Sequence, residues 1–318
     1  MRWPLIRLLP TRTQFKFVKW APYAAILSAV LVLGSFASFA TLGLNLGIDF
    51  KGGTLIEVAT PGPAPLAQLR VSLAKHGAHD PQVQGFGAPN AAMLRFRPAA
   101  GQDPLQAANS IRTSLAQEFP GIQFKRVEAV GAKVSGELLT GGFLALGVAL
   151  ALMLAYIWFR FQLQFGLGAV LAVLHDIVLT LGILSVLQIE FSTTSIAALL
   201  TVIGYSMNEK VITFDRLREN LRKYRRMPLR DVIDLSENER LSRTLITGST
   251  ALLALAGALL FGGPVLFPLV FSMVFGIIVG TYSSIYVALP LVLVWGVKRG
   301  DEAPPASRGN GKAALQRP

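Results

Sequence analysis

Long apolar runs dominate the pattern of this chain of 318 residues. A helix needs about 20 apolar residues to cross the hydrocarbon core of a bilayer. Six runs reach that length, and we expect membrane spans at 20–42, 138–158, 165–187, 194–214, 244–263 and 266–296. The pattern predicts a polytopic α-helical membrane protein with six transmembrane helices. The first run is too long for the apolar region of a signal peptide, so an uncleaved anchor fits it better.

Segment 43–137 has a different pattern, with short alternating elements and turn residues. Strands are expected in "NLGIDFKGGTLIEVAT" (one strand or a broken pair), "PQVQGFG", "AAMLRFRP" and "IQFKRVEAVG". Helices are expected in "APLAQLRVSLAKHG" and, after an Asp cap and a Pro, in "DPLQAANSIRTSLAQEF". In the second helix, the inward positions would be Leu105, Ala108, Ile111, Leu115 and Phe119. The order β-α-β-β-α-β predicts a ferredoxin-like α+β domain.

Composition supports a membrane protein, with 52% hydrophobic and 15% charged residues and a mean hydropathy of +0.51. The net charge of +12 does not indicate nucleic acid as a partner, because Lys and Arg cluster between the apolar runs. Cytoplasmic segments carry such clusters. We therefore expect a cytoplasmic arm at 1–19, a cytoplasmic basic loop at 215–243 and a disordered cytoplasmic tail at 297–318, with 43–137 facing outward. The tail would act as an orientation signal, or it would contact anionic membrane lipid or the ribosome.

Glu209 and Lys210, which follow Asn208, interrupt the fourth predicted span. Ionisable residues inside a membrane are costly and usually functional. Arg243 begins the next, antiparallel span, so we expect it to meet Glu209 at similar depth. The pair would be either a proton-responsive switch or a static link between helices, and the sequence leaves both open. Lys210 points about 100° away from Glu209 and is expected to extend to the lipid headgroups.

Two further features lie within predicted spans. His175 and Asp176 sit near the middle of the third span, where they would form interhelical hydrogen bonds or belong to a proton path. Small residues recur every four positions in the sixth span, at Ser272, Gly276, Gly280 and Ser284. They predict close packing against another helix, within the chain or in a partner.

Signals of enzymes and cofactors are missing from the sequence. No Walker A pattern occurs, no cluster has metal-ligand spacing, and the chain has no cysteine. The two glycines of "DFKGGT" precede no phosphate-binding helix. We expect neither a cofactor nor a metal, no enzymatic activity, and an ion gradient as the energy source.

Five motifs, in order along the chain, resemble the SecF family of bacterial protein-export membrane subunits. They are "GIDFKGGT" (47–54), "VEAVGAKVSGEL" (127–138), "LHD" (174–176), "GYSMNEKVITFDRLREN" (204–220) and "LSRTLITGST" (241–250). The resemblance extends from about residue 15 to 297. It implies a six-span half of an RND-type transporter in the bacterial inner membrane, with a periplasmic ferredoxin-like domain between the first two spans.

The resemblance also implies a function and partners. The chain would pair with SecD, near the SecYEG channel and YajC. It would use the proton-motive force to help unfolded preproteins cross after the ATP-driven step of SecA. The family's proton-path Asp corresponds to Glu209 here, one methylene longer, and the family's Arg corresponds to Arg243. Asp215 and Arg216 match a family motif at the cytoplasmic end and are expected to anchor the adjacent loop.

The sequence leaves a second function open and makes a third one unfavourable. The chain would serve as a scaffold that stabilises SecD and the channel, with its ion pair holding helices together. A small-molecule efflux half would need a larger outward domain than 43–137 provides. The sequence leaves both H⁺ and Na⁺ open as the coupling ion.

Overall fold

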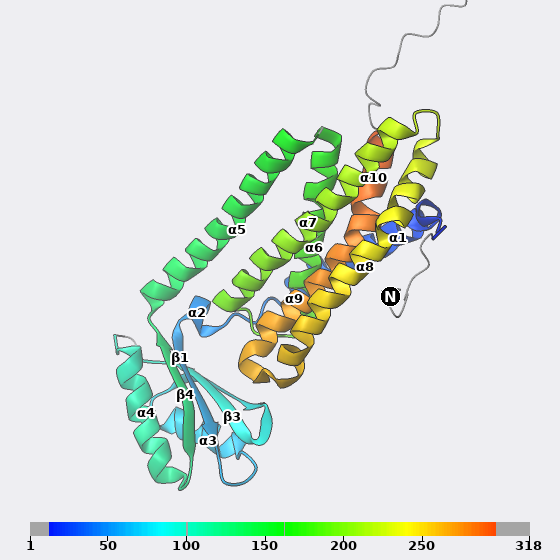
Figure 1. The fold of residues 1–318 in the computed structure, drawn as a ribbon. Coiled ribbons are helices and arrows are strands. Elements are labelled where there is room, and N and C mark those ends of the chain that lie inside the picture. Colours follow the sequence, from blue (N-terminus) through cyan, green and yellow to red (C-terminus); the bar gives the residue numbers. More distant parts are fainter. Residues whose placement is uncertain (1–12, 100, 162, 297–318) are drawn as a thin grey trace, which may run out of the picture.

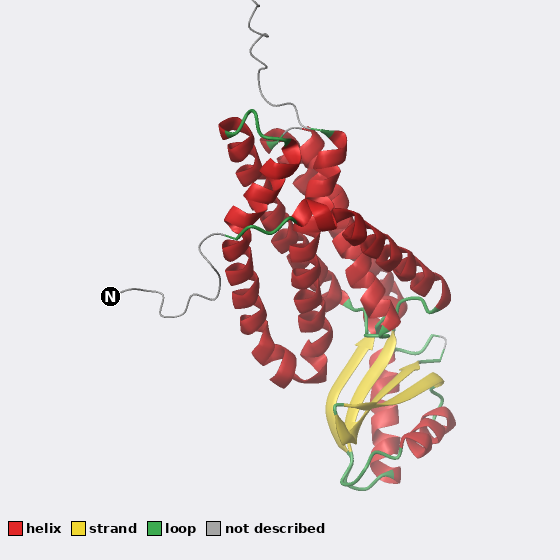
Figure 2. Ribbon diagram, turned by 90° about the vertical axis from the view of Figure 1, so that its right-hand side faces the viewer, coloured by secondary structure: helices red, strands yellow, loops and turns green. Residues whose placement is uncertain are grey.

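A computed structural model of the chain describes residues 13–99, 101–161 and 163–296. A bundle of long helices carries a small α+β domain at one end (Figures 1 and 2). The predicted tail at 297–318 and most of the predicted arm at 1–19 lie outside the described residues. The bundle contains α1 (Phe17–Thr41), α5 (Ala132–Arg160), α6 (Leu163–Val186), α7 (Thr193–Lys223), α8 (Leu229–Phe261), α9 (Gly263–Ser283), a π-helical turn η1 (Ser284–Ala288) and α10 (Leu289–Trp295).

Five of the described helices are long and apolar enough to cross a membrane: α1, α5, α6, α8 and the continuous helix Gly263–Trp295. The helix α7, which corresponds to the fourth predicted span, is not among them. Its middle turns carry Glu209 and Lys210, which lower its mean hydropathy. Both side chains are nonetheless buried inside the bundle, with at most 1% exposure, so they face protein.

The region predicted as a basic loop at 215–243 is mostly helical. The helix α7 continues to Lys223, and α8 begins at Leu229. Leu217 and Leu221 from α7 pack with Val232 and Ile233 from α8 in the main hydrophobic cluster. The prediction of a loop was wrong. The apolar residues of this region are spaced for one face of a helix, but they stand among many Arg and Lys residues, which hide the pattern.

The α+β domain has the predicted order of elements. It comprises β1 (Gly53–Ala59), α3 (Leu66–Lys75), β2 (His79–Phe86), β3 (Ala88–Arg97), α4 (Pro104–Glu118) and β4 (Gln123–Val130). The strands form one antiparallel sheet in the order β2-β3-β1-β4, which is the split βαβ arrangement. A core that includes Ile56, Leu69, Leu94 and Leu115 joins the sheet to its helices.

Two details of this domain differ from the prediction. The stretch before β1 forms a one-turn helix, α2 (Ile48–Lys51), rather than a strand. In α4, Leu105 is 57% exposed, and Ala107 is buried in addition to Ala108, Ile111 and Leu115. Asp103 caps this helix through hydrogen bonds from the backbone N–H groups of Leu105 and Gln106, so Leu105 lies in the first turn of the helix.

The two glycines of "DFKGGT" have a structural explanation. Gly52 and Gly53 have φ angles of +68° and +119°, which residues with a Cβ rarely adopt. A Cβ on Gly53 would also lie 2.8 Å from the backbone oxygen of Phe96. The pair therefore makes the sharp turn from α2 into β1 and lets β1 approach β3 closely.

Candidate functional site

Five charged side chains are buried where α6, α7, α8 and α9 meet. Among the described bundle residues, these are the carboxylates of Asp176, Glu209 and Glu237 and the cations of Lys210 and Arg240. Each is at most 4% exposed. Burying a charge costs several kcal/mol unless it is paired, so the arrangement of this group defines the candidate site.

The first cluster lies between α7 and α8. Arg240 forms a bidentate pair with Glu237, with Nε–Oε1 and Nη2–Oε2 distances of 2.7 and 2.6 Å. Its Nη1 atom is 3.4 Å from Oε2 of Glu209, a weak contact. Glu209 Oε2 also accepts a hydrogen bond of 3.0 Å from the hydroxyl of Thr244. Arg240 further donates to Ser284 on η1, which ties the cluster to the end of α9.

The predicted pair of Glu209 with Arg243 is wrong in this structure. Arg243 is exposed, whereas Arg240 and Thr244, one turn apart, share the face of α8 that meets Glu209. Because 3.6 residues make a turn, Arg243 points about 100° away from Thr244. Arg240 was missed because it lay within the region read as a loop. Asn208 is exposed and lies on another side of α7 from the cluster.

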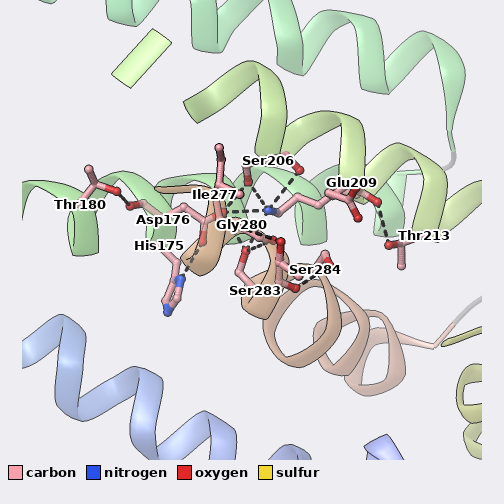
Figure 3. A network of polar contacts seen from close by, with 12 residues as sticks. His175, Asp176, Thr180, Ser206, Glu209, Thr213, Ile277, Gly280, Ser283 and Ser284 are labelled. Carbon is pink, nitrogen blue, oxygen red and sulfur yellow. Dashed lines mark hydrogen bonds and ion pairs between the residues drawn. The ribbon is translucent and has the colours of Figure 1, made fainter. Parts of the chain in front are cut away.

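The second cluster lies between α6, α7 and α9. Lys210, which was expected to reach the headgroups, is fully buried, and its Nζ atom is 2.8 Å from Oδ2 of Asp176. Ser206 and Ser283 donate to the same Oδ2 atom at 2.5 and 2.8 Å. Figure 3 shows Asp176, Ser206 and Ser283 converging from the three helices. The ammonium stays in the protein because a carboxylate and two hydroxyls satisfy it there.

His175 joins this cluster at its edge. Its Nδ1 atom lies 3.0 Å from Oδ1 of Asp176, and its ring stacks on that of Tyr282. The two neighbours thus contact each other, although successive helix positions point in different directions. Of these two residues, only Asp176 contacts Lys210. The Nε2 atom of His175 is buried with no hydrogen-bond partner among the described residues.

The small-residue seam of α9 packs within the chain, against α7. A Cβ on Gly276 would lie 2.2 Å from a methyl group of Val202, and one on Gly280 would lie 3.1 Å from Ser206. Ser272 and Ser284 are fully buried. The seam therefore lets α7 and α9 approach closely, which brings Ser283 and Ser284 to the two clusters.

The α7 residues Asp215 and Arg216 connect that helix to its neighbours. Asp215 pairs with Arg160 at the end of α5, with an N–O distance of 3.0 Å. Arg216 pairs with Glu239 of α8 at 2.8 Å and with Glu219 at 2.6 Å. Both residues lie in a helix rather than beside a loop, and they join α7 to α5 and α8.

Comparisons with known proteins give the family. The family described as "Protein export membrane protein SecD/SecF, C-terminal" matches residues 110–298, and the "SecD/SecF GG Motif" matches residues 37–60. The protein translocase subunit SecF of Cereibacter sphaeroides is 43% identical over 306 residues, which cover 93% of this chain and 94% of the relative. The SecF subunit of Vibrio alginolyticus is 39% identical, covering 95% of this chain and 96% of the relative.

Solved structures agree with these relatives. The crystal structure of SecDF from Thermus thermophilus, described as a translocon-associated membrane protein, matches with a TM-score of 0.83 and 32% identity. The match covers 91% of this chain and 40% of the SecDF chain. A SecDF structure in a super-membrane-facing form matches with a TM-score of 0.63 and 31% identity. This polytopic helical membrane protein belongs to the SecF family.

Proposed function

We propose that this chain is an accessory subunit of the Sec translocon that uses the proton-motive force to promote late translocation and release of preproteins, without hydrolysing nucleotides itself. SecD would supply the other half of the assembly, since the chain spans 40% of the matched SecDF chain. SecYEG and YajC would lie nearby, and SecA would act before it. The family and the buried charges support this proposal.

The proposed topology has six spans, with both termini in the cytoplasm and the α+β domain in the periplasm of an inner membrane. The connections between helices support it. The α6–α7 link and the α8–α9 turn lie against the domain, through the ion pair of Glu190 with Arg95 and the approach of Pro264 to Gly87. The end of α5 meets the later part of α7 through Arg160 and Asp215, at the other end of the bundle. Successive helices therefore alternate in direction, and α7 would cross with its charges turned inward.

One observation carries the proton-coupled mechanism: the five buried charges include three carboxylates and only two cations. Lys210 is matched to Asp176, and Arg240 makes its bidentate pair with Glu237. Glu209 is the carboxylate left without a full ionic partner. A buried surplus charge is costly, so Glu209 is the group that would take up a proton from one side of the membrane and release it to the other.

Arg240 would convert this protonation into movement. With Glu209 neutral, Arg240 remains on Glu237. With Glu209 ionised, the guanidinium is drawn toward it from a starting distance of 3.4 Å. Because Arg240 also holds Ser284, that shift would move α8 against η1 and α9. A π-helical turn at this point is consistent with a functional site.

The test uses inverted membrane vesicles in which a preprotein has completed its ATP-driven step. Release would be measured with and without an imposed proton gradient, at equal levels of the SecD–SecF complex. We expect Glu209→Gln to lose the gradient-dependent part of release and to keep the rest. Glu219→Gln, on the exposed face of the same helix, is the matched control and should behave as wild type.

The scaffold function is the competing proposal, and the same experiment separates the two. A scaffold held together by ion pairs would lose assembly with SecD when Glu209 is neutralised, and release would fall with and without the gradient. If the Glu209→Gln variant assembles and keeps its full gradient-dependent release, Glu209 carries no proton.

A further inference from the structure

The ammonium of Lys210 is held by oxygen atoms on several sides. Asp176 supplies Oδ2 at 2.8 Å, Ser283 supplies Oγ at 3.0 Å, and Ser206 supplies both Oγ at 2.5 Å and its backbone oxygen at 3.5 Å. These four oxygens come from α6, α7 and α9, and Figure 3 shows Asp176, Ser206 and Ser283 close together. We call this arrangement the oxygen cage.

The chemistry of the oxygen cage is that of a site for a hard cation. It combines one carboxylate, two hydroxyls and one carbonyl, and hard cations prefer such oxygen ligands. An ammonium is a compact point charge that only donates, so it fills the place that such an ion would take. The π-helical turn η1 begins at Ser284, next to Ser283, and such turns inside helices frequently occur at functional sites.

We propose that Lys210 is a tethered cation that occupies a latent Na⁺ site and thereby excludes Na⁺ from the bundle. The residue is then a determinant of ion specificity, because it leaves the proton-binding carboxylate of Glu209 as the only surplus charge in the group. This inference rests on the proposed function, which needs an ion gradient. It also explains why a lysine lies fully buried beside a carboxylate that must change its charge.

The proposal predicts that removing the Lys210 side chain creates a Na⁺ site. The full chain would be purified with SecD in detergent, and thermal unfolding would be followed in NaCl and in choline chloride at equal ionic strength. The melting temperature of Lys210→Ala should rise in NaCl by about 2 °C or more, as expected for a ligand that binds the folded state only. Wild type should melt at the same temperature in both salts.

Two matched variants locate the effect. Lys210→Met fills the cage with an uncharged chain of similar length and should show no difference between the salts. Lys210→Ala combined with Asp176→Asn removes the cage's only negative charge and should also show none. A salt difference that persists in the double variant would overturn the proposal, because Na⁺ would then bind elsewhere.

The remaining outcomes also decide the matter. Equal melting of Lys210→Ala in both salts would overturn the proposal, as would a Na⁺-specific rise in wild type. If Lys210→Ala is too unstable to purify in choline, its recovery only from membranes solubilised in NaCl would support it, and its failure in both salts would contradict it. None of these measurements uses a gradient, so they can fail independently of the release experiment on Glu209.

Discussion

Arg240 is the cation shared by the carboxylates of the first cluster, and its removal tests that assignment. Glu237 and Glu209 would both remain buried in Arg240→Met with no guanidinium to balance them. Removing one member of a buried ion pair typically costs about 3–5 kcal/mol of the free energy of unfolding. We expect a loss of that size at pH 8, measured by unfolding of the SecD–SecF complex in mixed micelles.

Arg243→Met is the matched comparison for stability, because it removes the same side chain one turn away. Since Arg243 is exposed, we expect the free energy of unfolding of Arg243→Met to differ from that of wild type by less than about 0.5 kcal/mol. Adding Glu237→Gln to Arg240→Met should recover part of the loss, because one unpaired carboxylate is then gone. A larger loss of stability in Arg243→Met than in Arg240→Met would contradict the assignment. It would support the pairing of Glu209 with Arg243 that the sequence predicts.

For single residues, the sequence predicted which charged side chains are important better than it predicted what they contact. Glu209 and Asp176 are conspicuous because charges are rare in apolar runs, and both lie in the buried group. The partner of Glu209 depends on which face α8 turns toward α7, and a one-residue rotation moves a side chain by about 100°. Lys210 was assigned to the headgroups because the carboxylate that holds it is 34 positions away in sequence.

Among the elements, the two helices of the α+β domain are tied together by one carboxylate. Glu118 at the end of α4 accepts hydrogen bonds from Ser72, His76 and Lys75 of the α3 end, at 2.5, 2.9 and 3.0 Å. These bonds, that of Ser72 foremost, lower the pKa of Glu118 from 4.5 to about 2. The contact therefore favours the ionised carboxylate.

The sign of the pH dependence follows from this lowered pKa. A carboxylate with a depressed pKa in the folded state contributes stability above its unfolded pKa of 4.5, and loses it as the pH falls toward about 2. We expect amide hydrogen exchange in α3 and α4 of the full chain to be slower in wild type than in Glu118→Gln at pH 6. The difference should disappear by about pH 2. A difference unchanged across this range would mean that the charge of Glu118 contributes nothing.

The elements themselves were largely predictable, because each depends on a local pattern. Asp103 and Pro104 mark the start of α4, and the described order of strands and helices in the domain is the predicted one. The helical extension of α7 and α8 beyond the apolar runs was not predicted. It depends on Leu217 and Val232 meeting across the hairpin, a contact that neither run shows by itself.

Across the whole molecule, α7 links the buried charges to the α+β domain. Its first residue, Thr193, donates to Oδ2 of Asp49 through both its backbone N–H, at 2.9 Å, and its hydroxyl, at 2.7 Å. The segment just before α7 also pairs with the segment that leads into the domain, through Gly47 N–H to Phe191 O and Phe191 N–H to Asn45 O. A displacement of α7 would therefore reach α2 and β1 directly.

The bonds of Thr193 with Asp49, and of Phe191 with Gly47 and Asn45, form a joint between α7 and the domain. Through this joint, protonation near the middle of α7 would move a domain at its end. The sequence contains both halves of the joint, but they are separated by more than 140 positions, and no local pattern connects Asp49 to Thr193. The family comparison marks the GG motif at residues 37–60 without explaining it. In the structure, the segment that holds Gly52 and Gly53 also holds the Asp49 carboxylate, which binds the N-terminal end of α7.

Breaking the joint should uncouple the domain from the buried charges while leaving those charges intact. Asp49→Ala removes the one oxygen that accepts from both donors of Thr193. We therefore expect loss of the gradient-dependent part of preprotein release, with normal assembly with SecD and normal ATP-driven steps. Asp49→Asn keeps an acceptor oxygen but not the charge near the α7 N-terminus, so its loss should be smaller. Thr193→Ser retains both donors and should release preprotein as wild type does. Full gradient-dependent release by Asp49→Ala would show that α7 transmits its movement by another route, and the contact of Arg95 with Glu190 would then be the next to remove.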